Sequence, residues 1–110
     1  ETIAKVFKDC GYLCDTHTAT AWAVAEDFRN QVNDGRPMVV MSTASPYKFP
    51  AAVLSSLETL TDTDEFAQME ALEKLSGVAI PKNLAGLRQK PERHTGVINK
   101  EDMPDFVLSL

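Results

Sequence analysis

The sequence has few cysteines, few basic residues and no long apolar run. Two cysteines among 110 residues are too few for a disulfide framework. The 11 basic residues are outnumbered by 16 acidic ones, so the net charge is -5, and the basic stripe typical of nucleic-acid binding is missing. The apolar runs, such as residues 38–41, are far shorter than the roughly 20 residues of a membrane span. We therefore expect neither a nucleic-acid nor a membrane partner.

The remaining composition is that of an ordinary globular domain, with 44% hydrophobic and 25% charged residues. The length suits one domain. No secretory leader is recognisable, so we expect a cytoplasmic location and reduced thiols. Acidic residues gather between Glu58 and Glu73, which indicates a solvated helix face or, alternatively, a docking surface for a basic partner.

A metal site is not expected. The candidate zinc ligands lack the paired short spacings of structural zinc sites. They are Cys10, Cys14, His17 and His94.

The spacing of apolar residues predicts a largely helical chain. Helices are predicted over residues 2–9, 16–32, 45–57, 62–76, 82–88 and 99–110. Asp15 or Thr16 is expected to cap the second helix, and Gly35 to adopt the left-handed conformation after it. Asp62 and Glu65 resemble a capping box for the fourth helix.

Inward-facing residues are predicted from the same spacing. In the second helix they are Ala19, Trp22, Ala25, Phe28 and Val32. In the helix that follows Asp62 they are Phe66, Met69, Leu72 and Leu75. In the last helix they are Met103, Phe106, Val107 and Leu110.

Two short apolar runs predict strands. Residues 38–41 are continuously apolar, which is typical of a strand buried on both faces, and residues 12–14 form a weaker candidate. A buried parallel strand needs neighbours on both sides, and this chain supplies only one or two strands, so the rest of the sheet must come from elsewhere. We therefore predict an α/β fold, mostly helices around one or two strands of a larger sheet, from the end of a longer protein.

A ligand-binding corner is predicted where residues 38–41 end. Ser42, Thr43 and Ser45 follow that strand and precede a helix, where backbone N–H groups suit an anion and a hydroxyl can donate to a neutral ring nitrogen. Lys48 adds a positive charge one turn further on. His17, near the start of the second helix, can hydrogen-bond a ligand. An ordinary helix start and a locally satisfied imidazole explain the same residues without a ligand.

Two stretches of the sequence resemble threonine synthase. Residues 11–21, GYLCDTHTATA, are similar to that family's GYxxDPHTAxA stretch, and residues 41–50, MSTASPYKFP, to its xSTAHPAKFP stretch. Thr16 and Ser45 stand where the family often has proline and histidine. The resemblance covers essentially the whole chain, as the C-terminal part of the longer form of the enzyme.

The resemblance implies a pyridoxal-phosphate enzyme of fold type II, the tryptophan-synthase-like fold, that acts as a lyase in threonine biosynthesis. Such an enzyme converts O-phosphohomoserine and water to threonine and phosphate. Thr43 matches the residue whose hydroxyl meets the pyridine nitrogen, with Ser42 beside it. Lys48 and His17 are weaker candidates for binding the substrate phosphate or shaping the pocket.

The same resemblance implies that this chain lacks a catalytic residue, because the family's Schiff-base lysine lies far upstream. Residues 1–57 are then expected to be part of the cofactor-binding α/β domain, and residues 58–110 a C-terminal helical extension. The main partner is the remainder of the same polypeptide, and this chain alone is expected to be inert.

Two other functions stay open from the sequence. One is a stand-alone acidic α/β binding module without catalysis. The other is the C-terminal part of a related pyridoxal-phosphate lyase, such as a threonine deaminase. The residues between Thr43 and Phe49 favour the synthase.

Overall fold

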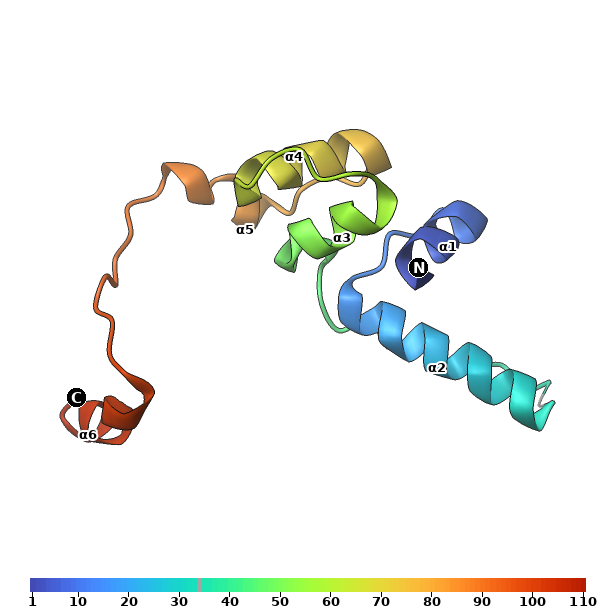
Figure 1. Ribbon diagram of the computed structural model, residues 1–110, viewed down its shortest axis with the longest axis horizontal. Helices are drawn as coiled ribbons and strands as arrows, with labels where there is room; N and C mark the ends of the chain where they lie inside the picture. The colour runs from blue at the N-terminus through green and yellow to red at the C-terminus, as the bar shows by residue number, and fades with distance from the viewer. Residues whose placement is uncertain (34) are drawn as a thin grey trace.

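The computed structural model describes residues 1–33 and 35–110, and within these ranges it is helical (Figure 1). The elements, in order, are α1 (Thr2–Cys10), α2 (Thr16–Val32), the 3₁₀ turn η1 (Pro46–Lys48), α3 (Pro50–Leu57), α4 (Glu65–Ser76), α5 (Lys82–Ala85), the 3₁₀ turns η2 (Leu87–Gln89) and η3 (Lys100–Asp102), and α6 (Met103–Leu108). No helix in the described ranges is both long and apolar enough to cross a membrane.

The predicted strands do not form in this chain. Residues 12–14 and 38–41 are coil, and the described residues contain no strand. A strand is defined by hydrogen bonds to a neighbouring strand, so an isolated apolar segment has nothing to pair with. The side chains of Val39 and Met41 remain 82% and 71% exposed, where the sequence predicted burial on both faces.

The hydrophobic core lies where α3 packs against both α1 and α4, and where α1 meets the start of α2 (Figure 1). Each helix contributes residues three or four apart, which share one face of a helix. The fully buried centre is formed by Val6, Cys14, Val53 and Leu72. The buried Tyr47 hydroxyl donates to the carbonyl of Val78 and so connects η1 to the chain after α4.

Two glycines end helices as left-handed residues. Gly11 has φ 66° and Gly77 has φ 71°, and the N–H of each closes the last turn of its helix. The predicted left-handed Gly35 is wrong, because α2 already ends at Asn33, which takes φ 47°. Asparagine tolerates this conformation better than other side-chain-bearing residues.

The start of α4 differs from the predicted capping box. Asp64, not Asp62, caps the helix by accepting from the N–H of Phe66 at 3.1 Å. Asp62 accepts from the N–H of Asp64, so each of the two carboxylates holds the backbone two residues further on. Glu73 accepts from the N–H of Ile80, while Glu58, Glu65 and Glu70 are exposed. Much of the acidic run is therefore solvated.

Two predicted apolar faces are not buried. The first turns of α2 bury Thr18 and Ala19, but the helix then extends away from the core and leaves Phe28 and Val32 each 48% exposed. Figure 1 shows α6 apart from the other helices, at the end of a long irregular segment. Its apolar residues Met103, Phe106 and Val107 are accordingly exposed, against expectation.

Asp15 is the N-cap of α2. Its buried carboxylate accepts from the N–H groups of His17 at 2.8 Å and Thr18 at 3.2 Å, and from the Thr18 hydroxyl. Burial by itself would raise the pKa of Asp15. The hydrogen bonds from Thr18 and His17 outweigh it, so the pKa lies below its ordinary value.

We predict that Leu72→Ala lowers the free energy of unfolding of this chain by about 2–5 kcal/mol, because Leu72 is completely buried between packed helices. Denaturant unfolding followed by circular dichroism measures the loss. Leu75→Ala is the matched control on the same helix, where the side chain is 42% exposed and a cost below about 1 kcal/mol is expected. Equal losses in the two variants would contradict this core.

We predict that Asp15→Asn destabilises the chain by about 1 kcal/mol at neutral pH, and that the difference shrinks in acid. A carboxyl whose pKa is lowered in the folded state stabilises the fold above its unfolded pKa of about 4. That contribution is lost as the pH falls through the lower folded-state pKa. Unfolding curves between pH 7 and pH 2 test this, with exposed Asp27→Asn on the same helix as control. A constant difference across that range would contradict it.

Candidate functional site

The N-terminal turn of α2 is the meeting point of the residues that the sequence singled out. Asp15 fixes this turn, and its neighbours His17 and Thr18 reach two different parts of the chain after residue 40. Thr18 contacts Ser42, and the ring of His17 lies 5.9 Å from the ring of Phe49. The structure thus gathers both predicted groups, Ser42 with Thr43 and His17 with Lys48, around one helix end.

Ser42 is held by two hydroxyl groups. Its Oγ lies 2.9 Å from the Tyr12 hydroxyl and 3.3 Å from Thr18 Oγ1. These contacts attach the segment after residue 38 to the start of α2 and to the connector between α1 and α2. Ser42 is therefore anchored by side chains 24 and 30 residues away.

Thr43 is adjacent but differs in its environment. Its side chain is exposed and makes no hydrogen bond with any described residue. Of the two predicted cofactor-binding hydroxyls, only the one on Thr43 is uncommitted. A free hydroxyl beside an anchored neighbour is well placed to donate to a ligand.

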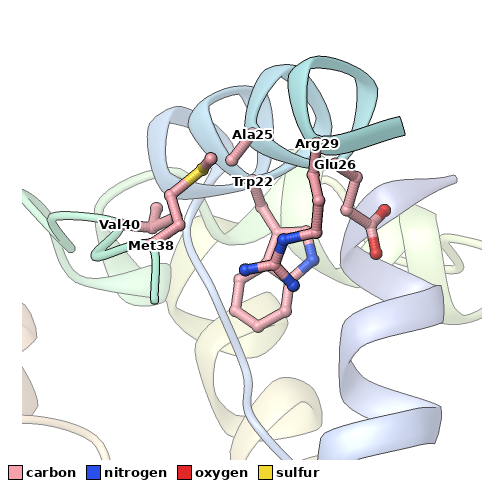
Figure 2. A pocket seen from close by; sticks show the side chains of 6 residues that line it. All are labelled: Trp22, Ala25, Glu26, Arg29, Met38 and Val40. Carbon is pink, nitrogen blue, oxygen red and sulfur yellow. The ribbon is translucent and has the colours of Figure 1, made fainter. Parts of the chain in front are cut away.

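Two pockets, each of about 260 Å³, lie along the same side of α2. One is lined by Tyr12, Thr18, Trp22, Val40 and Ser42. The other is lined by Trp22, Ala25, Glu26, Arg29, Met38 and Val40 (Figure 2). Figure 2 shows that its side chains come from α2 and from the segment before Ser42. Trp22 and Val40 line both pockets, so the two are neighbours.

Glu26, on the wall of the second pocket, is committed to the structure. It accepts from Lys5 Nζ at 2.8 and 2.9 Å, which ties α2 to α1. The hydrogen bonds from Lys5 and then from the Trp22 side chain lower the pKa of Glu26. The same pairing raises the pKa of Lys5.

Lys48 and His17 approach each other through Phe49. Lys48 Nζ lies 5.5 Å from the centre of the Phe49 ring, within the distance of a cation–π contact. The His17 ring borders the same aromatic ring, and His17 Nδ1 lies 3.4 Å from Asp15 Oδ1. A positive charge and an imidazole are therefore placed around one exposed aromatic side chain.

Ser45 has a structural role. Its Oγ accepts from the N–H of Tyr47 at 3.2 Å and caps η1, the turn that begins at Pro46. The helix predicted over 45–57 is divided in two, because α3 begins separately at Pro50. Of the candidate zinc ligands, Cys14 is buried in the core and Cys10 is exposed. No cluster of three potential metal ligands lies among the described residues. Burial raises the pKa of the Cys14 thiol.

Sequence reasoning missed Tyr12 and Thr18. Tyr12 lies in the predicted strand at 12–14, but its hydroxyl contacts Ser42. Thr18 lies three residues after the cap Asp15, a spacing that places the two side chains together at a helix start. That local signal was available, whereas the contact with Ser42 is long-range and has no signature in one sequence.

Comparison with known proteins assigns the chain to a family. Residues 18–107 match the family model described as threonine synthase, C-terminal. The chain is 35% identical over 104 residues to a threonine synthase of Pseudomonas aeruginosa, covering 91% of this chain and 18% of that protein. It is 33% identical over 90 residues to a threonine synthase of Corynebacterium glutamicum, covering 80% of this chain and 18% of that protein.

No solved structure matches the chain significantly. The chain spans less than one fifth of the length of the two relatives, both of which are named for the whole enzyme. The family match covers most of the chain and includes α2 from Thr18 onward, the hydroxyl pair and Lys48. The chain belongs to the threonine synthase family and corresponds to its C-terminal part.

Proposed function

We propose that this chain is the C-terminal portion of a pyridoxal-phosphate-dependent lyase that converts O-phosphohomoserine and water to threonine and phosphate. The family match carries the proposal. The site adds a physical reason, because it presents one anchored and one free hydroxyl at the start of a helix. No observation favours a stand-alone binding module or a threonine deaminase.

Thr43 is proposed to donate to the pyridine nitrogen of the cofactor. Its exposed hydroxyl has no partner among the described residues, so it is free to do so. Bound pyridoxal phosphate supplies an electron sink for carbanions of the substrate. A hydroxyl, unlike a carboxylate, does not hold the ring nitrogen protonated, so Thr43 would moderate that sink. Ser42 stays beside Thr43 as its anchored neighbour.

Lys48 and His17 are proposed to serve the phosphate of the substrate. Phosphate is recognised by positive charge and by hydrogen-bond donors, and these two side chains converge on Phe49 within 6 Å of its ring. Both side chains are exposed, so a ligand can reach them.

The rest of the polypeptide is proposed to complete the site. Residues 1–57 would join the cofactor-binding α/β domain as part of a fold type II architecture, with residues 58–110 as a helical extension. The exposed apolar segment 38–41 supports this, because it lacks the neighbouring strands that such a sequence requires. We further propose that the enzyme is cytoplasmic.

We predict that this chain alone does not turn over O-phosphohomoserine, because the lysine that binds the cofactor is proposed to lie outside it. Incubation with pyridoxal phosphate and substrate, followed by assays for threonine and phosphate, tests this. The longer protein that contains the chain is the positive control. Formation of threonine by the chain alone would refute the assignment of the catalytic lysine to another segment.

We predict that Thr43→Ala in the longer protein lowers its activity about tenfold or more, because a hydrogen bond to the cofactor ring is lost. Thr43→Ser keeps the hydroxyl and should retain most of the activity. Thr20→Ala is the control, since it removes a hydroxyl on α2 that contacts only the carbonyl of Thr16. Full activity of Thr43→Ala would remove Thr43 from the cofactor site.

A further inference from the structure

A chain of three hydroxyl groups leads from the pocket beside Trp22 to a buried carboxylate. The Tyr12 hydroxyl contacts Ser42 Oγ, Ser42 Oγ contacts Thr18 Oγ1, and the Thr18 hydroxyl contacts Asp15 Oδ2. Asp15 is 1% exposed and Thr18 is 2% exposed, so the inner end of this series of hydroxyl groups is shielded from water. The outer end lies on the wall of the pocket.

Because each group has a fixed number of protons, the donor of each hydrogen bond between these hydroxyl groups can be assigned. The lowered pKa of Asp15 means that its carboxylate is ionised at neutral pH and only accepts. Each hydroxyl has one proton to donate. The Thr18 proton goes to Asp15, so the proton between Thr18 and Ser42 must belong to Ser42. The proton between Ser42 and Tyr12 must then belong to Tyr12.

We propose that Asp15, acting through Thr18, is a positioning residue that holds Ser42, and with it the segment bearing Thr43, against α2. Ser42 then has no proton left for a ligand, and Thr43 becomes the donor of the pair. Tyr12, whose proton also points inward, offers only lone pairs to the pocket. The assignment of Thr43 as ligand donor rests on the proposed function, whereas the anchoring of the segment does not.

Trp22 provides a direct readout of this anchoring in the chain itself. It is the sole tryptophan and lines one pocket together with Thr18, Val40 and Ser42. Thr18→Val keeps the shape of the side chain but removes the hydroxyl, so the segment should detach and the Trp22 emission should shift to longer wavelength. Thr18→Ser should keep the native emission.

The matched control for this measurement is Thr20→Val. It makes the same change on the same helix at a hydroxyl outside the network, and its emission should be native. Ser42→Ala is a second variant that breaks the link while leaving the cap of α2 intact, which guards against loss of folding in Thr18→Val. Native emission of both Ser42→Ala and a folded Thr18→Val would overturn the proposal.

Cofactor binding by the longer protein tests whether the anchoring acts through Thr43. Titration with pyridoxal phosphate, followed by its absorbance, should show about tenfold weaker binding for Thr18→Val. In a Thr43→Ala background the same change should have less than about a twofold effect, because the group being positioned is gone. An equal loss in both backgrounds would overturn the role through Thr43.

The two hypotheses fail in different ways. If Thr43→Ala leaves both the affinity and the spectrum of the bound cofactor unchanged, the proposed function of Thr43 is wrong. A Trp22 shift in Thr18→Val would still support the anchoring in that case. If the Trp22 shift is missing while Thr43→Ala weakens binding, the anchoring is wrong and the proposed function stands.

Discussion

The buried carboxylate of Asp15 is the contact on which the site depends. Asp15 is the last residue of the connector after α1 and follows the fully buried Cys14. Its carboxylate caps α2 and accepts from the hydroxyl of Thr18. A buried charge is tolerated only when its hydrogen bonds are satisfied, and three donors satisfy this one. Because Thr18 also contacts Ser42, the position of the segment at 38–43 is tied to the same group that starts the helix.

Apolar residues are enclosed in the core but exposed along α2 and the neighbouring segment. Around Val53 and Leu72, three short helices enclose side chains completely. Along the outer half of α2 and the segment at 38–41, residues of the same apolar character stay exposed around an open pocket lined by Val24, Phe28 and Val39. Exposed apolar surface of this extent marks a place where something else packs. Under the proposed function, we expect the rest of the polypeptide to cover it.

Local features of the fold could be predicted from the sequence, because their causes lie within one helical turn. The Asp15 cap, the left-handed Gly77 and the restart of the helix at Pro50 all follow from nearby residues. The predicted strand at 38–41 does not form, because the described residues contain no other strand for it to pair with. The contact between Tyr12 and Ser42 could not be predicted either, because a single sequence does not show which hydroxyls 30 residues apart will meet.

The three hydroxyl groups would also let an ionised carboxylate and a neutral cofactor contact coexist in the proposed site. A carboxylate at the pyridine nitrogen would hold a proton there and strengthen the electron sink. Asp15 reaches the segment that carries Thr43 through the Thr18 hydroxyl, which contacts Ser42 on that segment. Its charge orients these groups and anchors the segment, while the group presented to the proposed cofactor remains a neutral hydroxyl. In the proposed site, the same arrangement would make Ser42 a structural residue and Thr43 a binding one, although the two are adjacent and chemically alike.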